Sequence, residues 1–181
     1  MPESPLPVMD RKGIPRIKLR FFISPDIRKN SLLRLIIVFT VLFFVLLWVT
    51  NLLLYLQIGF SYDSVVEYYR GSEANFRPPK SYLGMLEEAH FHFFSMAVIL
   101  VTLNHLILFT ALGNVWKLLL IVSSFLSALG DIMGGWLIRY VSAEFAYLKI
   151  ASVVVLQVSL ALLMVIIIWF LYYNRKDASY Q

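Results

Sequence analysis

The three histidines of the chain, His90, His92 and His105, fall within one long hydrophobic segment, and Asp131 falls within the next. Ionisable side chains are costly inside a lipid bilayer, so those that occur there usually bind a ligand, move protons or pair with one another. Imidazole and carboxylate groups ligate haem iron or divalent metals, and they also hydrogen-bond a quinone. We therefore take these four residues as the candidate cofactor-binding set.

The spacing of these residues predicts polar side chains at two different depths in the membrane. Helical residues advance by ~100° and ~1.5 Å each, so His90 and His105 share a face and lie about 22 Å apart in depth, whereas His90 and His92 point ~200° apart. His92 and Asp131 are expected ~6 Å and ~12 Å below the same membrane boundary. The sequence thus predicts a site in one half of the membrane, with His105 at a second, deeper level.

Haem b is the first of three chemistries that fit. The histidine separations along the segment match those of helices that stack two haems across a membrane. Each haem needs a second axial ligand from another helix, and no other segment contains a histidine. That ligand would have to come from Met133, from Met164, from a second copy or from a neighbouring subunit.

A divalent metal and a quinone are the other two. Glu88 and His92, one helical turn apart, could bind a metal together with His90 and Asp131, because these side chains offer oxygen and nitrogen ligands. The histidines and Asp131 could instead hydrogen-bond a quinone headgroup or relay protons. The alternative is that these groups only orient helices or hold a partner subunit.

The elements that must position these residues are four hydrophobic segments. The chain has 181 residues, 60% of them hydrophobic, with a mean hydropathy of +0.75. Four runs, at about 35–59, 88–113, 117–139 and 149–173, reach the ~20 residues that a helix needs to cross a bilayer. We predict an all-α, integral membrane four-helix bundle in one domain, residues 35–174, in contact with membrane lipid.

The basic residues predict the orientation of the bundle. Most Lys and Arg residues lie in the first 34 residues, in the turn before residue 118 and in the tail 175–181. Because cytoplasmic segments are enriched in Lys and Arg, we expect both termini to be cytoplasmic and the loop 60–87 to lie outside. The net charge of +5 follows from this bias, so we predict no nucleic-acid partner. The absence of cysteine excludes disulfides and thiolate metal sites.

The outer loop, residues 60–87, has the pattern of a short interfacial helix followed by an extended stretch. Gly71 should end the helix, Pro78 and Pro79 favour an extended backbone, and Ser81 is suited to begin the second span as its N-cap. The loop is either a lid over the outer end of the bundle or a docking surface for an extracytoplasmic partner.

Small residues surround Asp131 at helical spacing, which predicts that it is buried between helices rather than facing lipid. A buried carboxylate needs a partner, and the sequence offers His90, His92, Arg139 or a bound cation. The alternative is a protonated, hydrogen-bonded carboxyl group that has only a structural role.

Two stretches, EAHFHFFSM at 88–96 and GDIMGGWLIRY at 130–140, resemble a family of small four-span bacterial inner-membrane proteins. That family carries His-x-His at the outer start of the second span and Asp followed by Gly-Trp-Leu-x-Arg in the third. The resemblance covers residues 60–170. It implies a multi-pass protein of the inner membrane and adds Trp136 and Arg139 to the residues of interest, but it implies no particular activity.

From these observations we expect a membrane protein that binds a redox cofactor, metal or quinone between its second and third spans. It would serve as an electron-transfer component or an accessory subunit, with other membrane or periplasmic subunits or a second copy as partners. We expect no catalytic activity of its own, because no nucleophile, base and orienting acid come together in the sequence. The competing hypothesis is a structural or assembly subunit without a cofactor.

Overall fold

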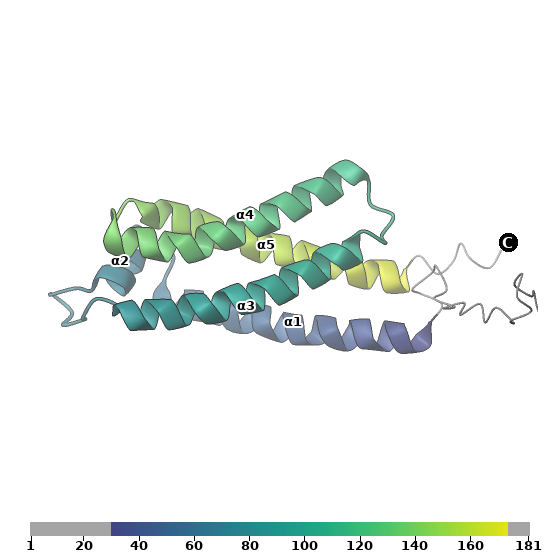
Figure 1. The fold of residues 1–181 in the computed structure, drawn as a ribbon, viewed down its shortest axis with the longest axis horizontal. Coiled ribbons are helices and arrows are strands. Elements are labelled where there is room, and N and C mark those ends of the chain that lie inside the picture. The colour runs from purple at the N-terminus through teal and green to yellow at the C-terminus, as the bar shows by residue number, and fades with distance from the viewer. Residues whose placement is uncertain (1–29, 174–181) are drawn as a thin grey trace, which may run out of the picture.

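The computed structural model describes residues 30–173, which form five α-helices (Figure 1). They are α1 (Ser31–Ile58), α2 (Tyr62–Arg70), α3 (Tyr82–Ile107), α4 (Asn114–Tyr140) and α5 (Phe145–Tyr172). The predictions for the segment before residue 30 and for the tail after residue 173 lie outside the described residues.

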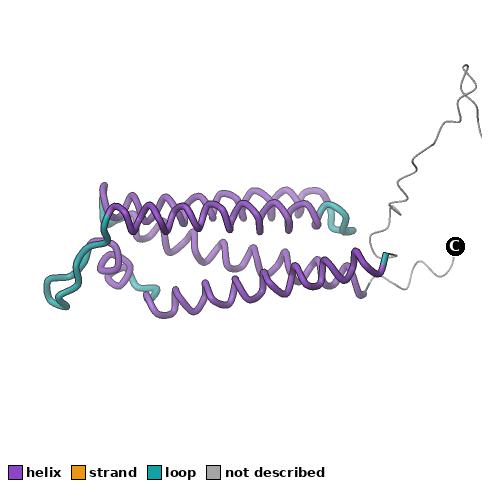
Figure 2. Tube along the Cα trace, turned by 60° about the horizontal axis from the view of Figure 1, so that its bottom comes forward, coloured by secondary structure: helices purple, strands orange, loops and turns teal. Residues whose placement is uncertain are grey.

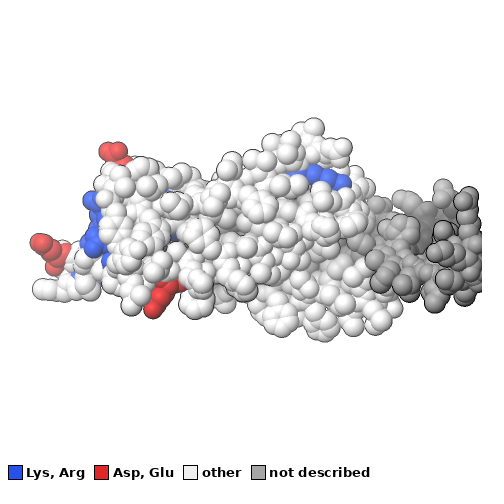
Figure 3. All heavy atoms as spheres, in the orientation of Figure 1, with Lys and Arg blue, Asp and Glu red and all other residues white. Residues whose placement is uncertain are grey.

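Four of the helices are long and apolar enough to cross a membrane, namely α1, α3, α4 and α5. At ~1.5 Å per residue each is about 40 Å long, more than the ~30 Å of a hydrocarbon core. On the face drawn in Figure 3, most Lys, Arg, Asp and Glu side chains of the described residues gather at one end, and most of the middle is uncharged. The prediction of an all-α membrane bundle is confirmed, and the protein is a multi-pass integral membrane protein.

The second predicted span, 88–113, differs from α3 at both ends. The helix begins earlier, because the Ser81 side chain accepts a hydrogen bond from the amide of Gly84 and caps the first turn. It also ends earlier, at Ile107. Beyond that end, Lys117 donates hydrogen bonds to the carbonyl groups of Leu108 and Thr110, which replace the bonds that further helical turns would have made.

Helices α4 and α5 form the most closely packed pair of the bundle. Glycines on α4 allow this approach, because a Cβ atom on Gly130 would meet Ser152 at 2.3 Å and one on Gly134 would meet the Lys149 backbone at 3.2 Å. Helix α1 packs mainly on α5. The core between the long helices is formed by fully buried aliphatic residues such as Leu103, Ile107 and Leu163.

The short helix α2 and the loop after it lie at one end of the bundle, opposite the end where α1 begins and α5 ends (Figures 1 and 2). The predicted short helix and its stop at Gly71 are confirmed. Val65 and Tyr69 of this helix are buried against α4 and α5 beside Ile138 and Ala146, rather than facing outward. Helix α2 therefore covers this end of the bundle as a lid.

The loop after α2 folds back on itself as a short hairpin. Ser72 and Arg77 exchange two backbone hydrogen bonds of 2.9 Å. The turn begins at Gly71, whose φ of +81° is a left-handed conformation that residues with a side chain rarely adopt. At its tip Phe76 has a φ of 49° and is 94% exposed.

We predict that Gly71→Ala destabilises this outer hairpin. An alanine Cβ would meet the Arg77 carbonyl oxygen at 2.5 Å and the Pro79 nitrogen at 2.7 Å, in a strained backbone conformation. The expected loss is about 1–3 kcal/mol of unfolding free energy, measured in mild detergent. Ala74→Gly, an exposed change in the same turn, should stay within about 0.5 kcal/mol of the wild type. Equal losses from both variants would contradict the prediction.

Candidate functional site

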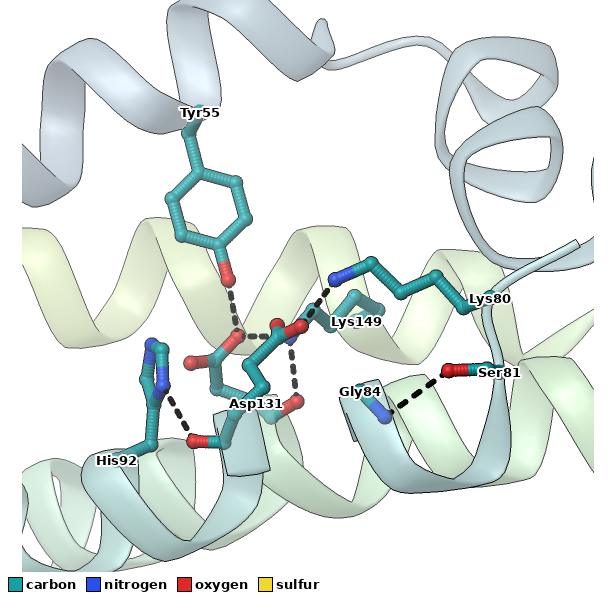
Figure 4. Close-up of polar contacts among 8 residues, drawn as sticks. Tyr55, Lys80, Ser81, Gly84, His92, Asp131 and Lys149 are labelled. Atoms are coloured by element: carbon teal, nitrogen blue, oxygen red, sulfur yellow. Dashed lines mark hydrogen bonds and ion pairs between the residues drawn. The ribbon is translucent and has the colours of Figure 1, made fainter. Parts of the chain in front are cut away.

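A buried ion pair joins α4 and α5 near the lid end of the bundle (Figure 4). The Lys149 ammonium group lies 2.6 Å from Oδ1 of Asp131 and also donates a hydrogen bond of 2.7 Å to the Asp131 backbone carbonyl. The hydroxyl group of Tyr55, on α1, donates to the same Oδ1 atom at 2.5 Å. The side chains of Asp131 and Lys149 are only 1% and 5% exposed, so water barely reaches the pair.

Aromatic rings and small residues enclose this pair. The Lys149 ammonium group lies 5.6 Å from the ring centres of both Tyr55 and Tyr69, where the negative faces of the rings favour a cation. Gly135 makes room for the Tyr69 ring, since a Cβ atom there would lie 2.9 Å from it. Burial, together with the charges of Glu88 and Asp131, raises the pKa of Tyr69 well above its ordinary value, so this phenol stays neutral.

The prediction that Asp131 is buried and paired is confirmed, but the predicted partners were wrong. The partners are Lys149 and Tyr55, rather than a histidine or Arg139. Arg139 instead donates a hydrogen bond from Nε to the Lys80 carbonyl and so fastens the outer loop to α4. Trp136 packs edge-on against Tyr82 at the start of α3. Both residues therefore hold the outer loop and the start of α3 in place, rather than pairing with Asp131.

The three histidines occupy different environments. His92 is half-buried, and its Nδ1 atom lies 2.9 Å from the Glu88 carbonyl oxygen. Because a carbonyl oxygen only accepts, Nδ1 is the donor of this hydrogen bond, and in the tautomer with its single proton on Nδ1 the Nε2 atom is an acceptor. His90 and His105 are exposed on the outside of the bundle, with their rings edge-on to Phe91 and Phe109. The predicted cofactor-binding set is therefore not brought together at one place.

A small polar cavity between α3 and α4 links His92 with the ion pair. Its volume is about 10 Å³, and Glu88, His92, Asp131 and Lys149 contribute to its wall. That space suits about one water molecule. Glu88 also forms an ion pair with Lys80, so the cavity lies beneath a charged outer rim.

The predicted metal ligands, Glu88, His90, His92 and Asp131, do not converge. Within residues 30–173 no group of three or more His, Asp or Glu side chains has an arrangement that could hold a metal ion. Glu88 forms an ion pair with Lys80, Asp131 forms one with Lys149, and His90 is exposed on the outside of the bundle.

A much larger groove, with a volume of about 540 Å³, lies between α1 and α3. Its polar wall residues include Thr50 and Asn51 on α1 and His92 and Ser95 on α3. The floor reaches Leu160 on α5. Trp48, also in the wall, donates a hydrogen bond of 3.0 Å from its indole nitrogen to the Gln157 carbonyl of α5.

The groove could not be predicted from the sequence. A groove depends on the distance between two helices, which the composition of neither helix specifies. The local signal was a pair of polar residues, Thr50 and Asn51, within an uncharged span. His92 belongs to the walls of both the groove and the small cavity, and thus stands between them.

The comparison with known proteins identifies one family. The Aq_1264_TM model, which describes a transmembrane helical domain, matches residues 59–178. The chain belongs to this family. The Aq_1264_TM region contains α2 to α5 and hence His92, Asp131 and Lys149, whereas Tyr55 and the α1 wall of the groove precede it. No curated protein and no solved structure matches the chain.

Membership of Aq_1264_TM agrees with the expected membrane protein family and supports the helical membrane fold. It assigns no ligand to the chain. The function must therefore be inferred from the groove, the ion pair and the histidines.

We predict that Asp131 and Lys149 are strongly coupled in stability. Asp131→Asn and Lys149→Met should each lower the unfolding free energy by about 3–5 kcal/mol, because each leaves one charge buried without its partner. The double variant should recover most of that loss, since no uncompensated charge remains. Reversible unfolding in detergent measures all three differences as a double-mutant cycle.

Met133→Ala is the matched control, because this α4 residue is 47% exposed on the bundle surface. It should change stability by less than about 0.5 kcal/mol. A double variant as unstable as the sum of the two single variants would show that the ion pair carries no coupling.

Proposed function

We propose that the protein is a small subunit of the bacterial inner membrane that binds a quinol in the groove between α1 and α3. The observation that carries this proposal is a groove of about 540 Å³ with His92 in its wall. The location differs from the predicted one, because the space between the second and third spans near the ion pair is the cavity of about 10 Å³, too small for a cofactor.

The size and the walls of the groove suit a lipophilic small molecule. Ligand sites in proteins commonly enclose about 300–1,000 Å³ and are mostly apolar, with a few polar groups that orient the ligand. Leu54, Phe94 and Ile99 supply apolar wall surface here. Both helices that form the walls are membrane spans, so the groove opens sideways toward the acyl chains, from which a quinol with its isoprenoid tail would enter.

The polar groups on opposite walls suit the two ends of a quinol head. Nε2 of His92 is an acceptor and would receive a hydrogen bond from one quinol hydroxyl group. The amide group of Asn51, on the facing helix, both donates and accepts hydrogen bonds and would bind the other hydroxyl. Among residues 30–173 the Asn51 side chain has no hydrogen-bond partner, which leaves it available.

The charges around the groove favour a quinol over a phospholipid headgroup. A phosphate group would need a cation, and the residues of the groove wall include neither Lys nor Arg. The nearby ammonium group of Lys149 is already paired with Asp131 inside the bundle. A neutral head with hydroxyl groups is the better match.

The orientation that the basic residues predict places both termini in the cytoplasm and His92 in the outer half of the membrane. The chain would then hold a quinol near the outer face for a redox partner, as an accessory subunit of an electron-transfer complex. It offers binding and orientation, while the partner supplies the electron acceptor.

We predict that decylubiquinol quenches the fluorescence of the purified protein saturably through Trp48, which lines the groove. In lipid nanodiscs, Trp48→Phe should abolish the saturable part of the quenching. His92→Ala should raise the Kd about fivefold, because one hydrogen bond is worth about 1 kcal/mol. Titration of each variant with the quinol measures both effects.

The matched control is Phe93→Ala, a change beside His92 at a residue that is 46% exposed and outside the groove wall. It should leave the Kd unchanged. Quenching that never saturates, or that persists unchanged in Trp48→Phe, would exclude a quinol in this groove. Loss of a larger membrane complex on gene deletion, without quinol binding, would favour the structural or assembly subunit instead.

A further inference from the structure

The exposed face of α3 carries the two histidines that the groove does not use. His90, Phe94, Val101 and His105 are all exposed to the outside of the bundle. At ~100° per residue, the other three lie within about 40° of the direction of Phe94. They therefore form one continuous stripe, here called the α3 stripe, with a histidine toward each end and apolar residues between.

We propose that the α3 stripe is an interface between two copies of this chain, and that the paired histidines of the two copies bind two haem b groups. An iron with two histidine ligands needs one imidazole on each side of the porphyrin, so the two histidines must lie on different helices at the same depth. The chain contains only three histidines, and His92 lines the groove and the small cavity instead. A second imidazole at the depth of His90 or of His105 therefore has to come from another molecule.

A second copy supplies those ligands by symmetry. Two copies inserted with the same orientation form a two-fold dimer whose axis runs along the membrane normal. Each stripe residue near that axis then faces its own counterpart at equal depth. His90 would pair with its counterpart toward the outer side and His105 toward the inner side, which gives two haem sites about 22 Å apart in depth.

The residues between the histidines suit the same arrangement. Phe94, at the edge of the groove, is 71% exposed, and Val101 is 60% exposed. Each lies about one helical turn from a histidine, where its side chain would pack against a porphyrin rather than against lipid. If lipid alone covered the stripe, both imidazoles would face acyl chains or headgroups without a hydrogen-bond partner or a metal. That arrangement has a higher free energy than imidazoles bound to haem iron.

The haem ligands of this inference, His90 and His105, do not line the quinol groove, so either proposal can fail alone although Phe94 borders both places. The test uses the full chain, purified in mild detergent and titrated with haem b in case expression leaves the sites partly empty. We expect a reduced-minus-oxidised spectrum of a low-spin b-type haem, one haem per chain, and a dimer by light scattering. The near-infrared magnetic circular dichroism should show two histidine ligands on each iron.

The variants separate the two sites. His90→Ala and His105→Ala should each halve the haem content, and the double variant should bind none. Phe93→Ala, an exposed change on the same helix about 100° from the stripe centre, should keep the full content. Circular dichroism of every variant checks that the helices remain folded.

Three outcomes would overturn the proposal. The first is a protein that stays colourless after haem titration. The second is a haem that remains bound in the double variant or that shows a methionine ligand. The third is a haem-loaded monomer, because a single chain would then hold both axial ligands without a second copy.

Discussion

The cost of a buried charge is the constraint on which the bundle depends. Asp131 and Lys149 lie at the interface of α4 and α5, where neither group could remain ionised alone. The pair is tolerated because the two charges are in contact, because the Asp131 backbone carbonyl and the Tyr55 hydroxyl group complete the hydrogen bonds, and because glycines bring the helices close enough. The buried ion pair and the close packing of α4 on α5 therefore depend on each other.

The same arrangement determines where α1 stands, and hence the shape of the groove. Two polar contacts tie α1 to its neighbours, from Tyr55 to Asp131 on α4 and from Trp48 to the Gln157 carbonyl on α5. Both point toward α4 and α5 rather than α3. Helix α1 is therefore held on that side of the bundle, and the space toward α3 stays open beside His92.

The sequence predicted the class of fold well, because each signal was local. Four long uncharged runs specify four membrane helices, Gly71 ends α2, and Ser81 begins α3, as the structure confirms. Asp131 was also placed correctly in the interior, because small residues recur around it at helical spacing.

The candidate site was less predictable, because it depends on which helix faces are turned inward. His90, His92 and Asp131 were expected to lie close together, yet only His92 borders a cavity with Asp131. Lys149, at the beginning of the fourth predicted span, was not among the expected partners of Asp131. The close approach of α5 to the glycines of α4 turns it inward instead.

The position of the ion pair in the chain also bears on how the protein enters its membrane. Asp131 and Lys149 lie on consecutive helices, 18 positions apart. A translocation channel would therefore release α4 and α5 as a helical hairpin whose two charges cancel, before any contact with α1 is needed. The carboxylate would then not have to enter lipid as an unpaired charge, because Lys149 would enter with it and neutralise it.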